Sequence, residues 1–401
     1  MNSEQAAGSS DLHSARQAEL RAGGVACGAH ALHDGYTDLI YVMLPIWQAE
    51  FGLGYAQLGA LRGLFAGTMA AFQIPAGLLG ERLGPAAVLA GGTAVAGLGY
   101  CLAGASAGFA MLVIALLVGG LGASTQHPLA AALTARAFAG RRSLKALGIY
   151  NFAGDIGKMT VPAIAALMIT VMAWRPALVI LGGLGIAAAL VIFAAAPRLQ
   201  TGAPAESANE TAELGKGGHV GFPVLVAIGI IDSATRMAFL TFLPFVLLAK
   251  GATLPTVGFA LTLVFAGGAV GKLVCAFLGA RIGAIATVCL TEMLTAAAIV
   301  ALLPLSLTAG LVLLPLIGVA LNGTSSVLYG SVPDLVPADK RARAFGIFYT
   351  GTIGAGAVAP ALYGLVGDRL GVPTTLLLVA AVVLATVPLA LLLRPALVVR
   401  R

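Results

Sequence analysis

Charge and cysteine are both scarce in this chain of 401 residues, and each scarcity excludes a class of protein. Charged residues make up 10% of the chain and hydrophobic residues 59%, whereas soluble domains carry roughly 25% charged residues. A soluble protein of this length would not keep so much apolar surface away from water. The four cysteines are scattered, without CxxC or metal-ligand spacing, so a disulfide framework and a zinc site are not indicated. We expect no metal or other cofactor.

The positive charge is not gathered into a binding face. The net charge of +7 therefore predicts no nucleic-acid partner. Enzyme chemistry also lacks support, because neither a metal-ligand spacing nor a phosphate-binding loop occurs. A sensor or scaffold without transport activity would normally carry an added soluble domain, and the polar segments are too short for one. We therefore expect no enzyme.

Apolar segments of membrane-spanning length fill most of the chain. A helix needs about 20 apolar residues to cross about 30 Å of hydrocarbon. The 53 glycines fit close packing between such helices. The sequence predicts an all-α membrane protein with twelve transmembrane helices. Their expected ranges are 27–48, 55–78, 86–105, 109–137, 145–171, 175–196, 220–248, 255–278, 284–304, 308–331, 343–365 and 373–394.

The second half of the chain repeats the first. At a shift of 199 residues Pro45 meets Pro244, and at a shift of 198 Pro162 meets Pro360. Many secondary transporters consist of two homologous bundles, with the substrate site between them near the bilayer midplane. The repeat therefore predicts transport.

One polar stretch separates the two halves. Residues 197–219 have the composition of a flexible linker, so we expect a six-helix bundle at 27–196 and another at 220–394. Residues 1–26 lack the pattern of a signal peptide and are expected to form an N-terminal tail. Residues 395–401 are expected to form a C-terminal tail.

Lysine and arginine are divided unevenly between the two sets of loops. Arg175, Lys250 and Arg369 fall on one side, against sixteen residues on the other. The side with the excess is expected to face the cytoplasm. Both tails and the linker would then be cytoplasmic, in a protein of the cytoplasmic (inner) membrane whose partners are the lipid bilayer, protons and a small-molecule substrate.

Two glycine-rich turns occupy matching places in the two halves. Glycine permits a tight turn, and an arginine at a helix end can bridge to an acid or to a helix C-terminus when a gate closes. The alternative is that both are merely charged turns that anchor helices. The residues expected to gate are Gly77, Glu81, Arg82 and Gly84 in the first half and Gly279, Arg281 and Gly283 in the second.

These turns resemble the loop signature of the major facilitator superfamily. The resemblance implies that superfamily's fold, with two six-helix pseudo-repeats, and a monomer. Glu81 stands where the signature usually has aspartate, and Ala280 leaves the second copy without its acid, so the second gate is expected to be weaker. A third turn, Gly367–Gly371, is similar but lies on the opposite side in this topology, and we expect a structural role for it.

Ionisable side chains inside the expected helices are the default site candidates, because each costs about 2.5–3.5 kcal/mol at a helix centre on insertion scales. His30, Asp34 and Asp38 recur at every fourth residue and share one helix face. Two carboxylates one turn apart repel when both are ionised, which favours a proton on one of them. Asp34 and Asp38 are therefore candidate proton-coupling residues. His33 is expected to be solvated.

His127 is a third candidate for proton coupling. It precedes Pro128, which weakens the helix, and an imidazole titrates near neutral pH.

The remaining interior polar residues are expected to meet the substrate, and their four cations favour an anion. Two pairs with helical spacing, Asp155/Lys158 and Asp232/Arg236, are alternatively self-neutralising bridges without a further role. Glu292 is expected to be peripheral. The candidate substrate residues are His30, Arg62, Gln73, Asp155, Lys158, Asp232, Arg236 and Lys272.

Short motifs of the first half resemble the fosmidomycin-resistance branch of the superfamily. They are His30, Asp34, Leu44-Pro45, His127-Pro128, Gly154 and Gly157. This resemblance implies a proton-coupled exporter, an antiporter of small organic compounds that works by alternating access. Asp155 and Lys158 stand outside that pattern. The alternative is an importer or exchanger of an organic or inorganic anion on the same fold.

Overall fold

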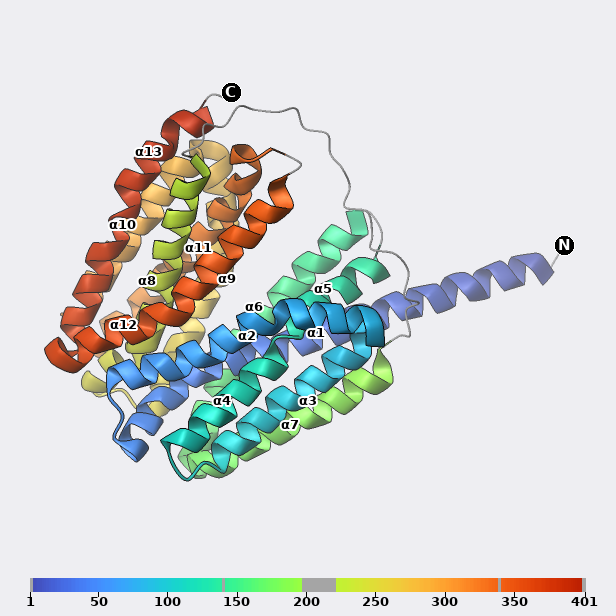
Figure 1. The fold of residues 1–401 in the computed structure, drawn as a ribbon, viewed down its shortest axis with the longest axis horizontal. Helices are drawn as coiled ribbons and strands as arrows, with labels where there is room; N and C mark the ends of the chain where they lie inside the picture. The colour runs from blue at the N-terminus through green and yellow to red at the C-terminus, as the bar shows by residue number, and fades with distance from the viewer. Residues whose placement is uncertain (1–2, 139–140, 197–220, 338–339, 399–401) are drawn as a thin grey trace. The chain divides into compact units, whose positions relative to one another are not determined.

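The structure is a computed structural model that describes residues 3–138, 141–196, 221–337 and 340–398, and its elements are helices (Figure 1). This confirms the predicted all-α class. In chain order the helices are α1 (Ser3–Phe51), α2 (Tyr55–Leu83), α3 (Pro85–Gly104), α4 (Phe109–Ala123), α5 (Gln126–Ala137), α6 (Arg141–Val171), α7 (Trp174–Ala195), α8 (Gly221–Ala249), α9 (Leu254–Ile282), α10 (Ala284–Leu302), α11 (Leu307–Leu335), α12 (Arg341–Val383) and α13 (Thr386–Val398).

Ten helical segments of the described chain are long and apolar enough to cross a membrane. The last of them, residues 343–395, holds two of the expected spans, which meet at Gly371 with its non-helical φ of 80°. The first expected span lies in α1, which is not among the ten because His30, His33, Asp34 and Asp38 make it less apolar. The predicted twelve spans are reached by counting α1 and by dividing residues 343–395 at Gly371.

α1 is longer than the span predicted at 27–48. It covers 49 residues and starts at Ser3, so the segment expected to be a tail, residues 1–26, is helical from that residue onward. A helix of this length rises about 74 Å, against about 30 Å of hydrocarbon, so much of it lies outside the apolar layer. At the other end α13 continues to Val398. The predicted linker, 197–219, lies outside the described residues.

The helix predicted at 109–137 is divided into α4 and α5. Pro128 has no N–H to offer to the carbonyl of Ser124, and its ring crowds that carbonyl. The hydroxyls of Ser124 and Thr125 donate to carbonyls three residues earlier, at 2.7 and 3.0 Å. The predicted weakness before Pro128 is confirmed, and it places His127 in the first turn of α5.

The backbone repeats together with the sequence. Gly84 and Gly283 have φ values of 89° and 87°, and Gly52 and Gly251, which are also 199 residues apart, have 63° and 86°. A positive φ of this size is accessible to glycine without steric cost. The turns that follow α1, α2, α8 and α9 thus each contain a glycine with a positive φ, in both halves of the chain.

The chain forms two compact units that differ from its two sequence halves. α1, α2 and α6 each contribute one end to each unit. The first unit consists of Met1–Thr37, Ala71–Val161 and Ala173–Ala208, and the second of Asp38–Ala70, Pro162–Met172 and Asn209–Arg401. The division of the protein into bundles at 27–196 and 220–394 remains a prediction.

Glycine sets how closely α1 and α6 approach within the first unit. A Cβ atom on Gly157 would lie 1.8 Å from the carbonyl oxygen of Ala31, and one on Gly35 would lie 2.3 Å from the side chain of Val161. No larger residue fits at these distances, so the two backbones are in direct contact. In the second unit α9 and α11 pack in the same way at Gly267, where a Cβ atom would lie 2.1 Å from a carbonyl oxygen of α11.

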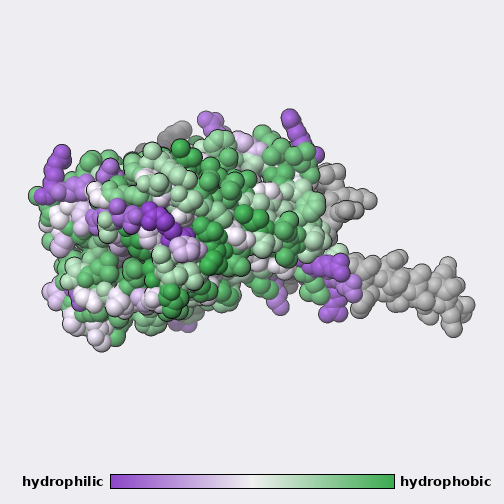
Figure 2. Space-filling model, turned by 90° about the horizontal axis from the view of Figure 1, so that it is seen from below, coloured by the Kyte–Doolittle hydropathy of each residue, from purple (hydrophilic) through white to green (hydrophobic). Residues whose placement is uncertain are grey.

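The surface of the protein is largely apolar. The face in Figure 2 is mostly covered by hydrophobic residues, and hydrophilic ones gather in a few places. Large apolar side chains stand exposed on several helices, among them Phe193 at 70%, Leu273 at 76% and Val312 at 77%. Patches of this kind are rare on soluble monomers and suit contact with lipid.

Replacing Gly157 with alanine should destabilise the protein, because the added methyl group forces α1 and α6 apart. Overpacking of this kind costs about 1–3 kcal/mol, so the midpoint of thermal denaturation in detergent should fall. Gly148 lies on the same helix, and a Cβ atom added there would have no neighbour within 4 Å. Gly148→Ala should therefore leave the midpoint unchanged or raise it. Equal shifts in both variants would contradict this packing.

Candidate functional site

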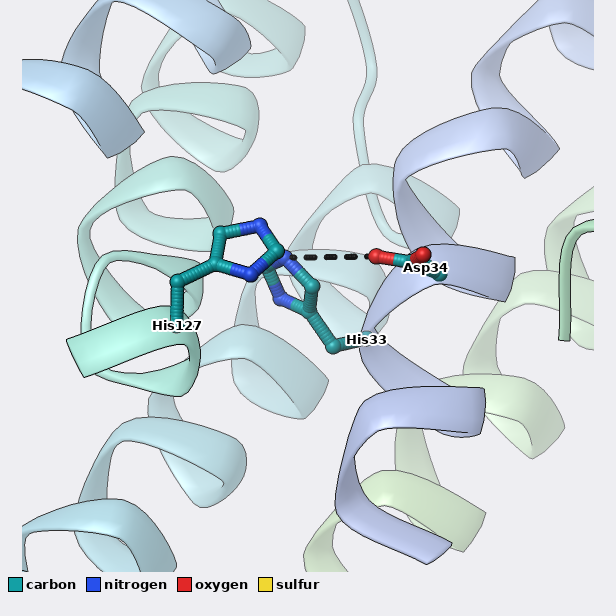
Figure 3. A group of neighbouring side chains, drawn as sticks. All are labelled: His33, Asp34 and His127. Carbon is teal, nitrogen blue, oxygen red and sulfur yellow. Dashed lines mark ion pairs between the residues drawn. The ribbon is translucent and has the colours of Figure 1, made fainter. Parts of the chain in front are cut away.

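The strongest cluster of polar side chains lies inside the first unit, around Asp34 of α1. Figure 3 shows Asp34 and His33 from α1 together with His127 from α5, with an ion-pair contact between His33 and Asp34. Asp34 Oδ1 is 3.4 Å from His30 Nε2 and 3.9 Å from His33 Nε2, and Asp34 Oδ2 is 3.3 Å from Lys158 Nζ. The Asp34 side chain is only 10% exposed. One buried carboxyl group thus has two imidazoles and an ammonium group around it.

Gly154 of α6 makes room for this cluster. A Cβ atom at Gly154 would lie 2.6 Å from Asp34 Oδ2 and 2.7 Å from His30 Cε1. Any larger residue would therefore push α6 away from α1 or displace the carboxyl group. Lys158, one turn after Gly154 in α6, contacts Asp34. The sequence Gly154-Asp-Ile-Gly157-Lys158 provides both the close approach and the cation.

His30 is held by a second helix. Its Nδ1 lies 2.8 Å from the carbonyl oxygen of Tyr150, and its ring stacks on that of Tyr150 with 4.0 Å between centroids. A carbonyl oxygen only accepts hydrogen bonds, so Nδ1 carries the proton that it donates. In neutral imidazole the other nitrogen, Nε2, is then an acceptor, and it faces Asp34 Oδ1. Two acceptors repel at 3.4 Å, so this contact is favourable when a proton lies on one of them.

His127 completes the cluster from α5. Its ring centroid is 4.8 Å from that of His33 and 5.5 Å from that of His30, in both cases edge to face. The prediction that His33 is solvated is wrong, because its side chain is only 6% exposed. Tyr150 was not recognised from the sequence, since its backbone carbonyl contributes to the site and no sequence pattern marks that role.

His33, Asp34 and His127 are also the group best placed to hold a metal ion. Their ligand atoms lie within 4.8 Å of one another, whereas a metal at about 2.0–2.2 Å from each would draw them to roughly 3.5 Å. The ammonium group of Lys158, 3.3 Å from Asp34, repels any cation at this position. The arrangement therefore suits exchange of protons better than a bound metal.

A second polar group lies inside the second unit, around Arg62 of α2. Its guanidinium carbon is 5.1 Å from the ring centroid of Tyr41, and one of its nitrogens is 4.0 Å from Met237 Sδ. The hydroxyl of Tyr41 donates to the same sulfur at 3.3 Å. Although Arg62 is 4% exposed, an aromatic face and a polarizable sulfur surround its charge. The sequence indicated Arg62, and Met237 was missed because nothing marks a methionine as polar.

The alternative of a bridge between Asp232 and Arg236 is not supported, because the two form no ion pair in the described residues. Arg236 Nη1 instead contacts Ser325 Oγ at 3.4 Å. Asp232 is buried in α8, and Glu292 of α10, expected to be peripheral, is 1% exposed. The spacing along α8 suggested that Arg236 would pair with an acid of its own helix. In the structure its hydrogen-bond partner, Ser325, lies on α11.

The other predicted residues are buried or half-buried. Asp38 and Asp155 are buried, at 6% and 7% exposure, and both make contacts of their own. Gln73 of α2 and Lys272 of α9 are half-buried, and they belong to different units. Of the predicted residues, His30, Asp34, His127 and Lys158 are brought together.

The two predicted gating turns are built alike but lack the predicted bridges in the described residues. Glu81 and Arg82 are exposed, and Arg281 lies over the ring of Phe277, one turn earlier in α9, at 4.6 Å. Gly84 and Gly283 have the positive φ values given above. Their gating role remains a prediction.

The third turn, Gly367–Gly371, binds a helix end. Asp368 accepts hydrogen bonds from the backbone N–H groups of Tyr55 at 2.5 Å and Ala56 at 3.1 Å, the first residues of α2. Those N–H groups have no partner within the helix, and a carboxylate there also interacts favourably with the helix dipole. Gly54 leaves the space, since a Cβ atom there would lie 2.9 Å from the carboxylate.

One pentapeptide has the sequence pattern of a hydrolase nucleophile. Gly104-Ala-Ser106-Ala-Gly108 matches G-x-S-x-G, which marks a nucleophile where a strand meets a helix. Here Ser106 follows the end of α3, is fully buried, and donates to the carbonyl of Ala103 at 2.7 Å. The serine closes a helix end and is not a nucleophile.

Comparison with protein families agrees with the fold and the repeat. The model of the Major Facilitator Superfamily matches residues 26–228 and 225–400. The chain belongs to this superfamily of transporters. It is an integral membrane protein with many spans, and it is not an enzyme.

Solved structures share this fold. A bacterial homologue of the human lysosomal transporter Spinster, in an inward-facing and unoccupied conformation, aligns with a TM-score of 0.81 at 15% identity, over 96% of this chain and 98% of that one. The same transporter in an occupied conformation aligns with a TM-score of 0.78, at 15% identity over 94% and 97% of the two chains. At this identity the likeness shows the fold alone.

Two named relatives match a smaller part of the chain. A probable L-galactonate transporter of Escherichia coli (strain K12) is 30% identical over 137 residues, which are 34% of this chain and 30% of the relative. A probable sulfoacetate transporter, SauU, of Cupriavidus necator is 29% identical over 148 residues, 37% of this chain and 34% of the relative. The chain thus matches about a third of the length of each. Neither is a fosmidomycin exporter, so the sequence resemblance is confirmed for the superfamily and not for that branch.

Replacing Asp368 with alanine should lower the midpoint of thermal denaturation, because the first N–H groups of α2 lose their acceptor. Loss of such a cap costs about 0.5–2 kcal/mol. Arg369→Ala changes the charge of the same turn, but its side chain is exposed and caps no helix in the described structure, so it serves as the control. If both variants shifted the midpoint equally, the effect would come from the turn and not from the cap.

Proposed function

We propose that this protein is a proton-coupled secondary transporter of small organic anions. The observation that carries the proposal is the contact between Asp34 and Lys158 inside the membrane-spanning region. The superfamily supplies transport by alternating access, and the two named relatives transport a sugar acid and a sulfonate according to their names. Both compounds carry the negative charge that a partly buried cation favours.

Coupling follows from what Asp34 does to Lys158. When Asp34 is ionised, it neutralises the ammonium group 3.3 Å away. When Asp34 takes up a proton, Lys158 loses this counter-charge, and an anionic substrate would supply another. Proton and anion therefore favour each other's binding, as linkage requires of two ligands that stabilise the same state.

The histidines give the proton a route to Asp34. His30 holds its Nδ1 proton on the carbonyl of Tyr150 and turns Nε2 toward Asp34, while His33 and His127 lie edge to face beside it. Imidazoles pass protons near neutral pH. We assign proton coupling to Asp34 with these histidines, and we keep Asp38 as a further candidate one turn away.

The remaining interior cations are proposed as contacts of the substrate in the unit where each lies. Lys158 belongs to the first unit, and Arg62, Arg236 and Lys272 to the second. Gln73, His30, Asp155 and Asp232 remain proposed polar contacts.

The coupling geometry favours uptake over export. Joint binding of proton and anion moves both in the same direction, which is symport, and a proton gradient directed into the cell then drives accumulation. The exporter expected from the first-half motifs is an antiporter, in which proton and substrate compete. We therefore propose the importer that the sequence left open as an alternative. The inner membrane, cytoplasmic termini and a monomer complete the proposal.

The direct test uses proteoliposomes with a pH-sensitive dye inside and an acidic medium outside. L-galactonate, sulfoacetate, a phosphonate, a neutral sugar alcohol and a cationic drug are added in turn. A transported anion should acidify the lumen, while the sugar alcohol should have no effect. If a compound exchanged across the membrane without moving protons, coupling would be refuted. If the cationic drug moved protons outward, the exporter would replace the importer.

Lys158→Met should reduce anion uptake roughly tenfold or more, since a hydrogen bond to a charged group contributes about 1.5–3 kcal/mol. Lys145, an exposed lysine of the same helix, provides the control, and Lys145→Met should leave uptake within about twofold of the wild type, as surface substitutions usually do little. Initial rates of labelled anion uptake measure both. Unchanged uptake in Lys158→Met would remove Lys158 from the substrate site.

The affinity for the anion should fall as pH rises in the wild type, because ionised Asp34 then occupies Lys158. Asp34→Asn imitates the protonated acid, so its affinity should vary less with pH and should exceed that of the wild type at high pH. Calorimetric titration across pH with the anion identified above measures both. The variant should still exchange anion but should not accumulate it against a gradient. An unaltered pH dependence in Asp34→Asn would place the coupled proton elsewhere.

A further inference from the structure

Two acidic side chains meet inside the second unit, away from the cluster around Asp34. Asp232 of α8 and Glu292 of α10 are 4% and 1% exposed, and their carboxyl groups are within hydrogen-bonding range of each other. Glu292 Oε1 is buried and has no hydrogen-bond partner among the described residues. Two carboxylates cannot hydrogen-bond each other when both are ionised, because neither then has a proton to donate.

The charges around this pair point to the same conclusion. Arg236 follows Asp232 by one turn of α8 and is the cation that acts on both acids. Two ionised carboxylates beside one guanidinium would leave a net negative charge in an apolar interior, which is costly. One proton on the pair makes the three groups neutral together.

Two tyrosines and a cysteine near the pair bring no charge of their own. Tyr329 of α11 interacts with Asp232 and Arg236, and Cys289 lies one turn before Glu292. Tyr349 of α12 packs on Tyr329, with 4.7 Å between ring centroids. Phenols and thiols are ordinarily neutral near pH 7. The hydroxyls of Thr291 and Thr324, joined at 2.8 Å, add dipoles and no charge.

We infer that Asp232 and Glu292 hold one proton between them at neutral pH, which makes this pair a proton-binding site of the second unit. Release of that proton would give the three groups a net negative charge, and uptake would restore neutrality. The pair therefore sets the net charge around Arg236. This inference needs only the fold, and it holds whether or not Asp34 couples transport.

Infrared spectroscopy of the full chain in lipid tests the inference without any substrate. A protonated carboxyl group has a C=O band that shifts in D₂O. The wild type should show such a band at neutral pH, and Glu292→Gln and Asp232→Asn should each remove the same share of it, because the remaining acid then ionises beside Arg236. The exposed acid Glu81 supplies the control, and Glu81→Gln should leave the band unchanged.

Arg236→Met provides an independent measure. Without the cation, both acids should be protonated at neutral pH, and the band should grow by about one carboxyl group. A band that survives in Asp232→Asn would assign the proton to Glu292 alone and overturn the sharing. A band unaffected by Glu292→Gln would show that Glu292 carries no share of the proton. An unchanged band in Arg236→Met would show that Arg236 does not control the protonation of the pair. Any of these three results would refute the inference.

Discussion

The ion pair between Asp34 and Lys158 connects the main features of this protein. A charge at the centre of a membrane helix costs about 2.5–3.5 kcal/mol on insertion scales, and each member of the pair relieves that cost for the other. The contact requires α1 and α6 to lie closer than ordinary side chains allow. Gly35, Gly154 and Gly157 provide that approach. The packing of the two helices and the chemistry between them thus depend on the same few residues.

Other charges, within the helices and in the loops, follow the same rule with different partners. Arg62 lies over Tyr41 and beside a methionine sulfur. Lys250 donates to the carbonyls of Leu303 and Leu305 at 2.7 and 2.6 Å, at the end of α10. Outside the helix centres, Arg142 of α6 makes a two-pronged contact with Glu19 of α1. Carbonyls, rings and sulfur thus stabilise cations in addition to carboxylates, and only the carboxylates can take up a proton and release the cation.

Much of the fold was predictable because it depends on local chemistry. The length of the apolar segments predicted the helices, and the sequence repeat predicted that the second half duplicates the first. Pro128 predicted the break between α4 and α5. The partners of charged residues were harder to predict. The spacing of Asp155 and Lys158 marked no partner outside their own helix, but Lys158 contacts Asp34 of α1. Glu292 was expected at the periphery, yet it is buried. Such contacts depend on which helices pack together, and spacing within one helix carries no information about that.

The carboxylate of Asp368 has a consequence for how the protein responds to its medium. It lies at the end of the eleventh predicted span and holds the first turn of α2, so it fastens a segment of the second repeat to one of the first. Asp368 is exposed, and exposed charges are screened over about 8–10 Å at physiological ionic strength. Dissolved salt weakens it, while the buried contacts of Asp34 are shielded from salt. The ionic strength of the surrounding solution thus affects the exposed contact of Asp368 and leaves the buried contacts of Asp34 unchanged.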